Sequence, residues 1–395
     1  MTGPPPLATQ FREHFGHRQH LYGVLLAELA DDLDAGGPTA AICRDVMSAP
    51  RGDAIQLRLL AGLFRIVLRG DAPQLTKFYP VLAGAPGSAR AGSPLALGDP
   101  GLAGDLRPVG DLGPVGGLGP VGDLGPVGDL GSGPDPEPVA DPEDAWPLVR
   151  AVLAAYADEL RAGLRLAPQT NEAGRSAALL AGLFEAVRRH GLHRVRLLEP
   201  GASAGLNLNV DKYRFTGPGW AWGPEGGPLA LDTGAALRPE HLTIVERRGC
   251  DLSPVQAATP EGAAYLTSFT WPFDLDRHTR LAAALTVLRA HPVAVDRAPA
   301  AAWVAGHLLA GSDDVLTVVW QSITRQYWPA LESDSVDASV EEARSRMPIS
   351  QIAMEGVPPR QTPGGYDIGR DGPTISVDGD VVARCHHHGP PIVLH

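Results

Sequence analysis

Residues 194–207 read Arg-Val-Arg-Leu-Leu-Glu-Pro-Gly-Ala-Ser-Ala-Gly-Leu-Asn. An apolar run ends in the acid Glu199, and a loop of small residues follows, with Gly201 and Gly205 four positions apart. The pattern predicts a buried parallel strand, a tight turn and the start of a helix. Such a turn lets a backbone approach a ligand closely, and a carboxylate beside it can accept hydrogen bonds from a ribose diol. An ordinary strand–turn–helix of an α/β protein fits the pattern as well.

Further apolar runs alternate with helical patterns along the second half of the chain. They predict strands at 242–254, 291–296, 314–322 and 348–355, and helices at 276–289 and 300–309. A terminal hairpin is predicted at 374–385, because Asp378-Gly379-Asp380 separates two alternating runs. In a doubly wound sheet, ligands bind beyond the carboxyl ends of the strands. We therefore expect Trp320, Gln321 and Ser322 to lie beside a ligand.

The first 82 residues predict a small helical subdomain. Leucines recur every fourth position in 11–33, and a second helix is predicted at 53–69 with Asp53 as its cap. His14, His17 and His20 are spaced by three, which could suggest a metal site. Surface histidines are the preferred interpretation, because a site on one exposed helix would be poorly enclosed.

Residues 83–141 differ sharply in composition from the rest of the chain. The unit Gly-Asp-Leu-Gly-Pro-Val at 110–115 recurs with small changes at 116–121 and 122–127. A β-solenoid would need more copies with fewer Pro and Gly residues to bury a core. The segment therefore predicts a Gly/Pro-rich disordered linker.

The third part, 142–395, opens with a predicted helix at 144–164 and a polar cluster at 168–175. Asn171, Glu172 and Arg175 in this cluster either cap the next helix, which Gly191 can end, or face a ligand. A Gly/Pro/Trp stretch at 216–230 predicts an insertion near the site. Its tryptophans, Trp220 and Trp222, either form a lid or pack onto the helical subdomain, and packing is preferred.

Composition bounds the class of protein. The chain has 395 residues, is 44% hydrophobic, carries a net charge of −12 and contains two lysines. It has no strongly basic run, which argues against binding nucleic acid. Neither a signal peptide nor an apolar run long enough to span a membrane is recognisable. Three dispersed cysteines favour a reduced, cytoplasmic setting.

The segment from Glu199 to Gly205 resembles the first motif of class I S-adenosylmethionine-dependent methyltransferases, with Ser203 at the middle glycine of that motif. The resemblance implies a doubly wound, methyltransferase-like (Rossmann-type) α/β sheet with a terminal hairpin. It implies that Asp251 takes the ribose hydroxyls and Asp296 the adenine amine. From the residues alone, a helix N-cap is the less favoured alternative for Asp251, and a turn residue is an equal alternative for Asp296.

Taken together, several segments resemble an uncharacterised bacterial family, domain of unknown function 2332. They are residues 169–172, 199–208, 211–214, 248–251, Trp271 and 320–322. Members of that family more usually have His where this chain has Gln321. The resemblance covers nearly the full chain apart from the repeat, and it implies no substrate.

The preferred hypothesis is an S-adenosylmethionine-dependent methyltransferase that acts on a small molecule. The implied cofactor-binding residues are Glu199, Gly201, Ser203, Gly205, Asn207, Asp251, Asp296 and Gln321. The implied substrate-binding residues are Asn171, Glu172, Arg175, Trp320 and Ser322, with Tyr327 or His388 as base. No metal is expected, because His386, His387 and His388 cannot all face one ion from a strand.

Two other hypotheses remain. The chain could be a non-catalytic nucleotide- or partner-binding protein that keeps the fold. It could also be a dinucleotide-dependent oxidoreductase, although the loop lacks the G-x-G-x-x-G order of that class. The absence of Asn/Asp-Pro-Pro-Tyr after the fourth strand argues against methylation of amino groups in DNA or glutamine.

Overall fold

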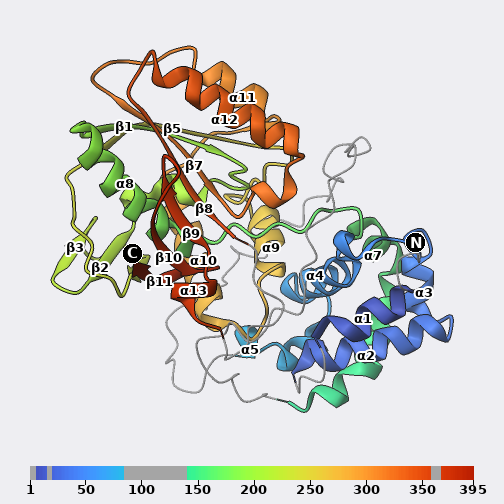
Figure 1. Cartoon of the computed structure of the whole chain (residues 1–395). Helices are drawn as coiled ribbons and strands as arrows, with labels where there is room; N and C mark the ends of the chain where they lie inside the picture. The colour runs from blue at the N-terminus through green and yellow to red at the C-terminus, as the bar shows by residue number, and fades with distance from the viewer. Residues whose placement is uncertain (1–5, 16–19, 84–139, 357–365) are drawn as a thin grey trace. The chain divides into compact units, whose positions relative to one another are not determined.

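The computed structural model describes residues 6–15, 20–83, 140–356 and 366–395 (Figure 1). Two compact units are present: Met1–Gln169 with Ala264–Thr279, and Thr170–Ala263 with Arg280–His395. Each is described by itself. Apart from Ala83, Ala140 and Asp141, the predicted linker at 83–141 lies outside the described residues.

The first unit is helical in the part that the structure describes. Its elements are α1 (Leu7–Phe15), α2 (Leu21–Asp34), α3 (Pro38–Cys43), η1 (Arg51–Asp53), α4 (Ile55–Leu68), η2 (Pro73–Phe78), α5 (Pro80–Ala83), η3 (Pro142–Ala145), α6 (Trp146–Ala155) and α7 (Ala157–Gly163). Two further helices, α9 (Pro260–Ser268) and α10 (Leu275–Ala290), contribute residues to both units.

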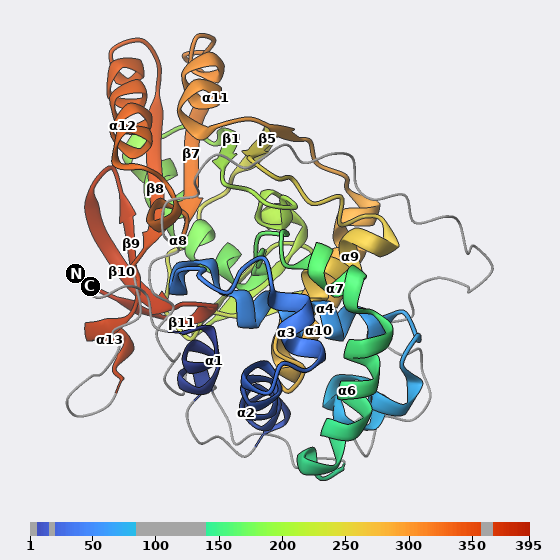
Figure 2. The same ribbon diagram turned by 90° about the vertical axis from the view of Figure 1, so that its right-hand side faces the viewer.

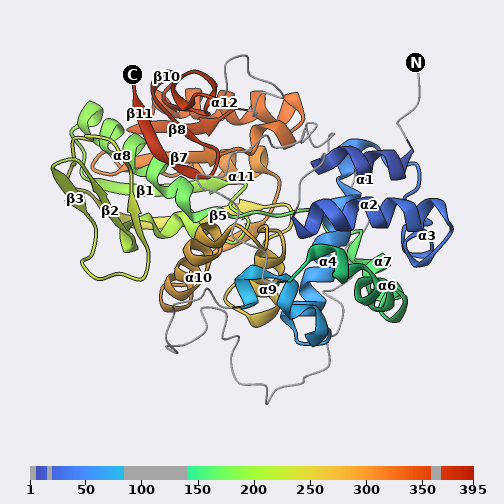
Figure 3. The same ribbon diagram turned by 90° about the horizontal axis from the view of Figure 1, so that it is seen from below.

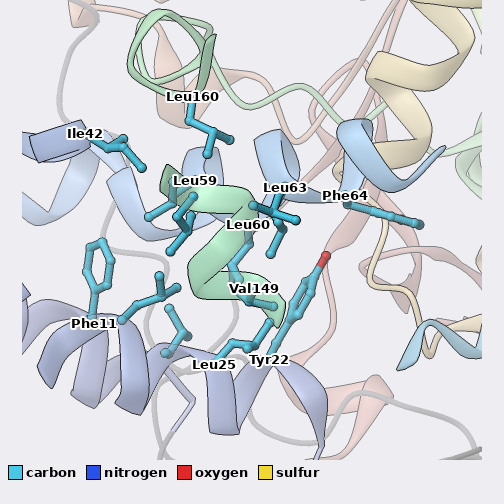
Figure 4. Packing of buried hydrophobic residues seen from close by; sticks show 14 of the residues in the cluster. Phe11, Tyr22, Leu25, Ile42, Leu59, Leu60, Leu63, Phe64, Val149 and Leu160 are labelled. Carbon is cyan, nitrogen blue, oxygen red and sulfur yellow. The ribbon is translucent and has the colours of Figure 1, made fainter. Parts of the chain in front are cut away.

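One apolar core holds the first unit together. Figure 4 shows Leu25 of α2, Leu59 and Leu63 of α4, Val149 of α6 and Leu160 of α7 pointing into it. The sequence division places 142–169 with the α/β part, whereas in the structure α6 and α7 share this core with the N-terminal helices. Helix periodicity reveals an apolar face but not the partner that covers it.

Three helix predictions need correction. The helix expected at 11–33 is two helices, α1 and α2. The one expected at 144–164 breaks at Tyr156, whose backbone (φ −114, ψ 25) leaves the helical region. Asp53 does not cap α4, because Ala54 is the N-cap residue, in a left-handed conformation (φ 49), and Asp53 closes the preceding turn η1.

The histidines of the first segment are not surface residues where they are described. His14 and His20 are each 8% exposed, and His17 lies outside the described residues. Burial lowers the pKa of His14 to about 4, and Nδ1 of His20 accepts a hydrogen bond from Gly23 N at the start of α2. Among the residues that the structure describes, no group of three His, Cys, Asp or Glu side chains is placed to hold a metal.

The second unit is an α/β fold around an eight-stranded, mostly parallel sheet. Its strand order is β11-β10-β9-β8-β7-β1-β5-β6, which can be followed from β10 to β5 in Figure 2. The strands are β1 (Arg194–Pro200), β5 (Thr243–Asp251), β6 (Val295–Arg297), β7 (Leu316–Ser322), β8 (Ile349–Glu355), β9 (Thr374–Val377), β10 (Asp380–His386) and β11 (Gly389–Leu394). The strands from β6 to β8 pair in parallel, and those from β8 to β11 pair antiparallel.

Helices cover both faces of the sheet. The remaining elements are η4 (Ala173–Arg175), α8 (Ser176–His190), η5 (Leu206–Lys212), α11 (Ala300–His307), η6 (Arg325–Tyr327), α12 (Ala330–Arg344) and α13 (Ile368–Asp371). Leu198 of β1 and Val319 of β7 face α11 and α12, which lie side by side in Figure 1. On the other face, Gly182 of α8 lies against Ile352 of β8. α8 ends at Gly191 as predicted, with φ +68.

The predicted insertion is a small second sheet. It is formed by β2 (Arg214–Gly217), β3 (Trp220–Trp222) and β4 (Ala230–Asp232), and Figure 3 shows β2 and β3 beside α8. The rings of Trp220 and Trp222 both pack edge-on against Phe184 of α8, and their indole N–H groups donate to Ala235 O and Glu240 O. They are packing residues, but their partner is α8 rather than the helical subdomain.

The terminal hairpin is confirmed, with β9 and β10 joined at Asp378 (φ 55) and Gly379 (φ 89). Positive φ at both residues is what an Asp-Gly turn between strands requires. The sequence does not predict β11, because Pro390 and Pro391 argue against a strand. An edge strand tolerates proline, and β11 is the outermost strand of the sheet. No described helix is long and apolar enough to cross a membrane.

Candidate functional site at the carboxyl end of the sheet

The chain direction reverses across the sheet between β1 and β7. After β1 the chain builds β5 and β6 on one side, and it then returns to place β7 and β8 on the other. In open α/β sheets the crevice at such a reversal, beyond the carboxyl ends of the strands, is where ligands bind. The tips of β1, β5, β7 and β8 therefore define the candidate site.

The loop after β1 has the backbone that its small residues predict. Gly201 (φ 78), Ser203 (φ 54) and Gly205 (φ 76) are all left-handed. A Cβ atom on Gly201 would lie 2.4 Å from Thr324 Oγ1, and one on Gly205 would lie 2.6 Å from Val293 Cγ2. The close approach that these glycines permit is therefore an approach to the protein's own side chains.

Every backbone N–H from 201 to 206 already has an acceptor within the protein. Those of Gly201 and Ala202 donate to Cys250 O, and that of Gly205 donates to Ala202 O. Ser203 N–H donates to Asp251 Oδ2 at 2.9 Å. Those of Ala204 and Leu206 share Asn171 Oδ1, at 3.2 and 2.9 Å. A ligand that used these donors would have to displace a protein group.

These bonds give Asn171 and Asp251 structural roles, which bear on the interpretations left open for the polar cluster and for Asp251. Asn171 does not cap a helix but holds the loop, whereas Glu172 accepts from Gly174 N at the start of η4. Asp251 binds the loop through one oxygen and accepts from Ser253 N through the other, at 2.8 Å. No helix begins between Asp251 and α9 (Pro260–Ser268), so Asp251 forms a turn rather than a helix N-cap, and its carboxylate is held at the tip of β5.

Glu199 lies at the tip of β1 and is 2% exposed. Burial raises the pKa of Glu199 to about 8. Asp251 adds to the rise, and Asn207, Trp320 and Arg175 oppose it. Among the described residues, Glu199 Oε2 has no hydrogen-bond partner. A buried polar atom without a partner costs about 1–3 kcal/mol, and at a strand tip it marks a place where a ligand group or a water belongs.

The neighbouring tip of β7 also carries buried polar atoms that have no hydrogen-bond partner among the described residues. Trp320 and Gln321 are fully buried, and Trp320 Nε1 and both polar atoms of the Gln321 amide have no hydrogen-bond partner in the described part of the chain. Asn207, also buried, accepts from Ser176 Oγ at 2.8 Å. Asp296, by contrast, is engaged: Arg248 Nη2 and Trp303 Nε1 donate to its carboxylate. A contact from Asp296 to adenine would compete with this pairing.

Arg175 joins the tip of β7 to the turn between β10 and β11. Its Nε donates to His387 O at 3.0 Å, and Nη1 approaches Ser322 O at 3.5 Å. Glu355, at the tip of β8, accepts from Thr324 N and Arg325 N. Burial raises the pKa of Glu355 to about 7, and these bonds together with the nearby arginines limit the rise.

The two residues predicted as bases, Tyr327 and His388, have different surroundings. Tyr327 lies in η6, where burial raises its pKa and the charge of Arg175 opposes the rise. His388 Nδ1 lies 3.9 Å from Glu172 Oε2. Both are in this unit, but neither is placed against Glu199 by a hydrogen bond that involves its side chain.

The model of a bacterial family, "Uncharacterized protein conserved in bacteria (DUF2332)", matches residues 7–96 and 132–393. The chain belongs to this family. The predicted membership is therefore confirmed, and the match includes all the strand tips described above. Neither the search of curated proteins nor that of solved structures found a match.

Two residues of this DUF2332 chain join the site in addition to the predicted site residues. Glu355 ends a predicted strand, as Glu199 does. An acid at the end of a predicted strand could therefore have identified Glu355 as a site residue. His387 is 5% exposed, and its Nδ1 faces Tyr366 Oη at 3.3 Å. Burial lowers the pKa of His387 to about 4, which keeps it neutral near pH 7. Its place depends on the turn between β10 and β11, and β11 could not be predicted.

The Ser203 backbone provides a direct test of the loop. A non-glycine residue at φ 54 is strained, so Ser203→Gly is expected to raise the free energy of unfolding by about 1 kcal/mol. Ser203→Ala is the control, because it removes the hydroxyl but keeps the strain. Urea titrations of the three proteins make the comparison, and a Gly variant no more stable than the Ala variant would contradict the assigned strain.

Proposed function

We propose that this protein is an S-adenosylmethionine-dependent methyltransferase that acts on a small molecule. The observation that carries the proposal is the buried carboxyl of Glu199 at the point where the strand order reverses, whose Oε2 has no hydrogen-bond partner among the described residues. At the tip of the adjacent strand β7, Trp320 and Gln321 carry further buried polar atoms without partners among the described residues. These orphaned groups fit a polar nucleoside better than an apolar ligand.

The mode of binding differs from the one that the first motif implies. Because the loop amides are already satisfied, side chains at the strand tips would hold the cofactor, and the loop would serve as their support. Glu199 and the rigidly held Asp251 would contact the nucleoside, and Gln321 and Ser322 would border the reacting end. Bound there, the cofactor supplies an electrophilic methyl group.

The remaining task of the protein is to align the acceptor and take its proton. Aligned, near-attack geometry alone provides much of the rate in such transfers. Glu355 is better suited than Tyr327 to accept a proton near neutral pH. The pKa of Glu355 is about 7, whereas burial raises that of Tyr327 above its ordinary value. Arg175 would hold the tip of β7 against the turn between β10 and β11 through Ser322 O and His387 O.

Equilibrium binding tests the proposal. Isothermal titration with S-adenosylmethionine and S-adenosylhomocysteine is expected to show one site, weakened at least tenfold by Glu199→Leu, which removes one buried hydrogen-bonding group. Glu342→Gln, at a side chain that is 74% exposed, is the control and should bind as the parent does. Folded protein that binds neither ligand at millimolar concentration would refute the proposal.

The second candidate is a non-catalytic protein that keeps this fold and binds a nucleotide or a partner. The complete occupation of the loop donors by Asn171, Asp251 and backbone carbonyls favours it. It predicts that a captured partner still binds Glu199→Ala and Asp251→Asn variants. Loss of partner and cofactor binding together in these variants would favour the methyltransferase.

A further inference from the structure

Two buried polar groups face the same side of the sheet at the tips of adjacent strands. Trp320 pairs with Ile352 of β8, which lies against Gly182 of α8, so the indole is on the α8 face. Leu198 pairs with Val319, and both face α11 and α12. One residue further along each strand, Glu199 and Trp320 therefore both project to the α8 face.

The two groups face each other without a hydrogen bond between them. The indole N–H favours the charged form of Glu199, as a donor directed at its carboxyl does. Yet within the described residues neither Glu199 Oε2 nor Trp320 Nε1 has a hydrogen-bond partner. Since an indole N–H can only donate, an oxygen atom that approaches both groups would satisfy it.

The charged and titratable groups around Glu199 do not compensate a buried negative charge. Asp251 at the tip of β5 disfavours the charge, whereas Arg175 of η4 and the neutral dipoles of Asn207 and Trp320 favour it. The nearby phenol of Tyr213 stays neutral, because burial raises its pKa. Within the described residues no side chain forms an ion pair with Glu199, and burial raises its pKa to about 8. At pH 7 the carboxyl is therefore predominantly protonated.

We propose that Glu199 acts as a neutral carboxylic acid and, together with the indole N–H of Trp320, donates hydrogen bonds to a single oxygen of the ligand. The inference rests on the proposed function and specifies the ligand atom: a hydroxyl or carbonyl oxygen that serves as acceptor, such as a ribose hydroxyl. It reverses the role expected from sequence, in which a charged Glu199 accepts hydrogen bonds from the diol.

Adenosine is the probe, because it does not itself titrate near pH 8. Its affinity for the full-length protein is expected to be constant from about pH 6 to pH 7.5 and then to fall about tenfold per pH unit above pH 8. Glu199→Gln keeps a neutral donor, so it should bind with nearly the parental affinity and lose the pH dependence. Trp320→Phe should weaken binding roughly 5–10-fold and retain the pH dependence of the parent protein. Near-ultraviolet circular dichroism verifies that each variant is folded.

The deoxy analogues identify the oxygen. One of 2′-deoxyadenosine and 3′-deoxyadenosine should lack the oxygen that accepts from Glu199 and Trp320. That analogue should bind more weakly than adenosine, and its affinity should not fall above pH 8. Affinity that rises with pH, or a Glu199→Gln variant that binds as poorly as Glu199→Leu, would overturn the donor role while leaving nucleoside binding intact. Failure of adenosine and S-adenosylhomocysteine to bind the parent protein would instead remove the proposed function itself.

Discussion

Replacing Glu199 with Gln is expected to stabilise the second unit increasingly as the pH rises from about 4 to 8. The folded protein holds the proton of Glu199 up to a pKa of about 8, against 4.5 for an ordinary glutamate. Because the pKa is raised on folding, the contribution of Glu199 to stability is fully present below pH 4.5 and is lost as the pH rises toward 8. A pKa difference of this size corresponds to roughly 4–5 kcal/mol over that range.

Urea titrations of the parent and Glu199→Gln at about pH 4.5 and pH 8 measure the effect. The Gln variant should be closer in stability to the parent at the lower pH and several kcal/mol more stable than it at the higher one. Glu342→Gln on exposed α12 is the matched control and should show no such divergence. A constant difference between parent and Glu199→Gln across this range would mean that Glu199 is charged in the folded state.

Replacing Asn171 with Ala is expected to destabilise the loop after β1 by roughly 2–4 kcal/mol. The change removes the one oxygen that accepts from both Ala204 N and Leu206 N, in a region where both residues are buried. Each buried donor left unsatisfied costs about 1–3 kcal/mol. Asn171→Asp keeps an oxygen in the same place and should cost much less.

Hydrogen exchange separates this local effect from general unfolding. In Asn171→Ala the amides of 204 and 206 should exchange much faster, while amides in the middle of β7 change only with global stability. Equal protection in both variants would show that water or another group takes the place of the Asn171 oxygen. The test also bears on function, since faster exchange would identify these two amides as donors that a ligand could recruit.

Local patterns predicted the skeleton of the second unit well. The apolar run before Glu199 is β1, the Asp378-Gly379 turn joins β9 and β10, and Gly191 ends α8. Each of these depends on a few consecutive residues: side-chain period in a strand, or tolerance of positive φ in a turn. The small residues at 201, 203 and 205 likewise predicted a tight turn after β1, and the backbone turns there with positive φ at all three positions.

Such local patterns did not predict four features of the structure. These are the protonation of Glu199, the partners of Asn171 and Asp251, the position of His387, and the core that α6 and α7 share with the N-terminal helices. All depend on residues far apart along the chain: Asn171 meets Leu206, and Arg175 meets His387. An acid at a strand tip reads the same in sequence whether it is solvated or enclosed, because its pKa is set by surrounding groups that folding brings together. Chain-local chemistry thus specified strands, turns and the acid at the tip of β1, whereas the packing of distant segments determined what that acid can do.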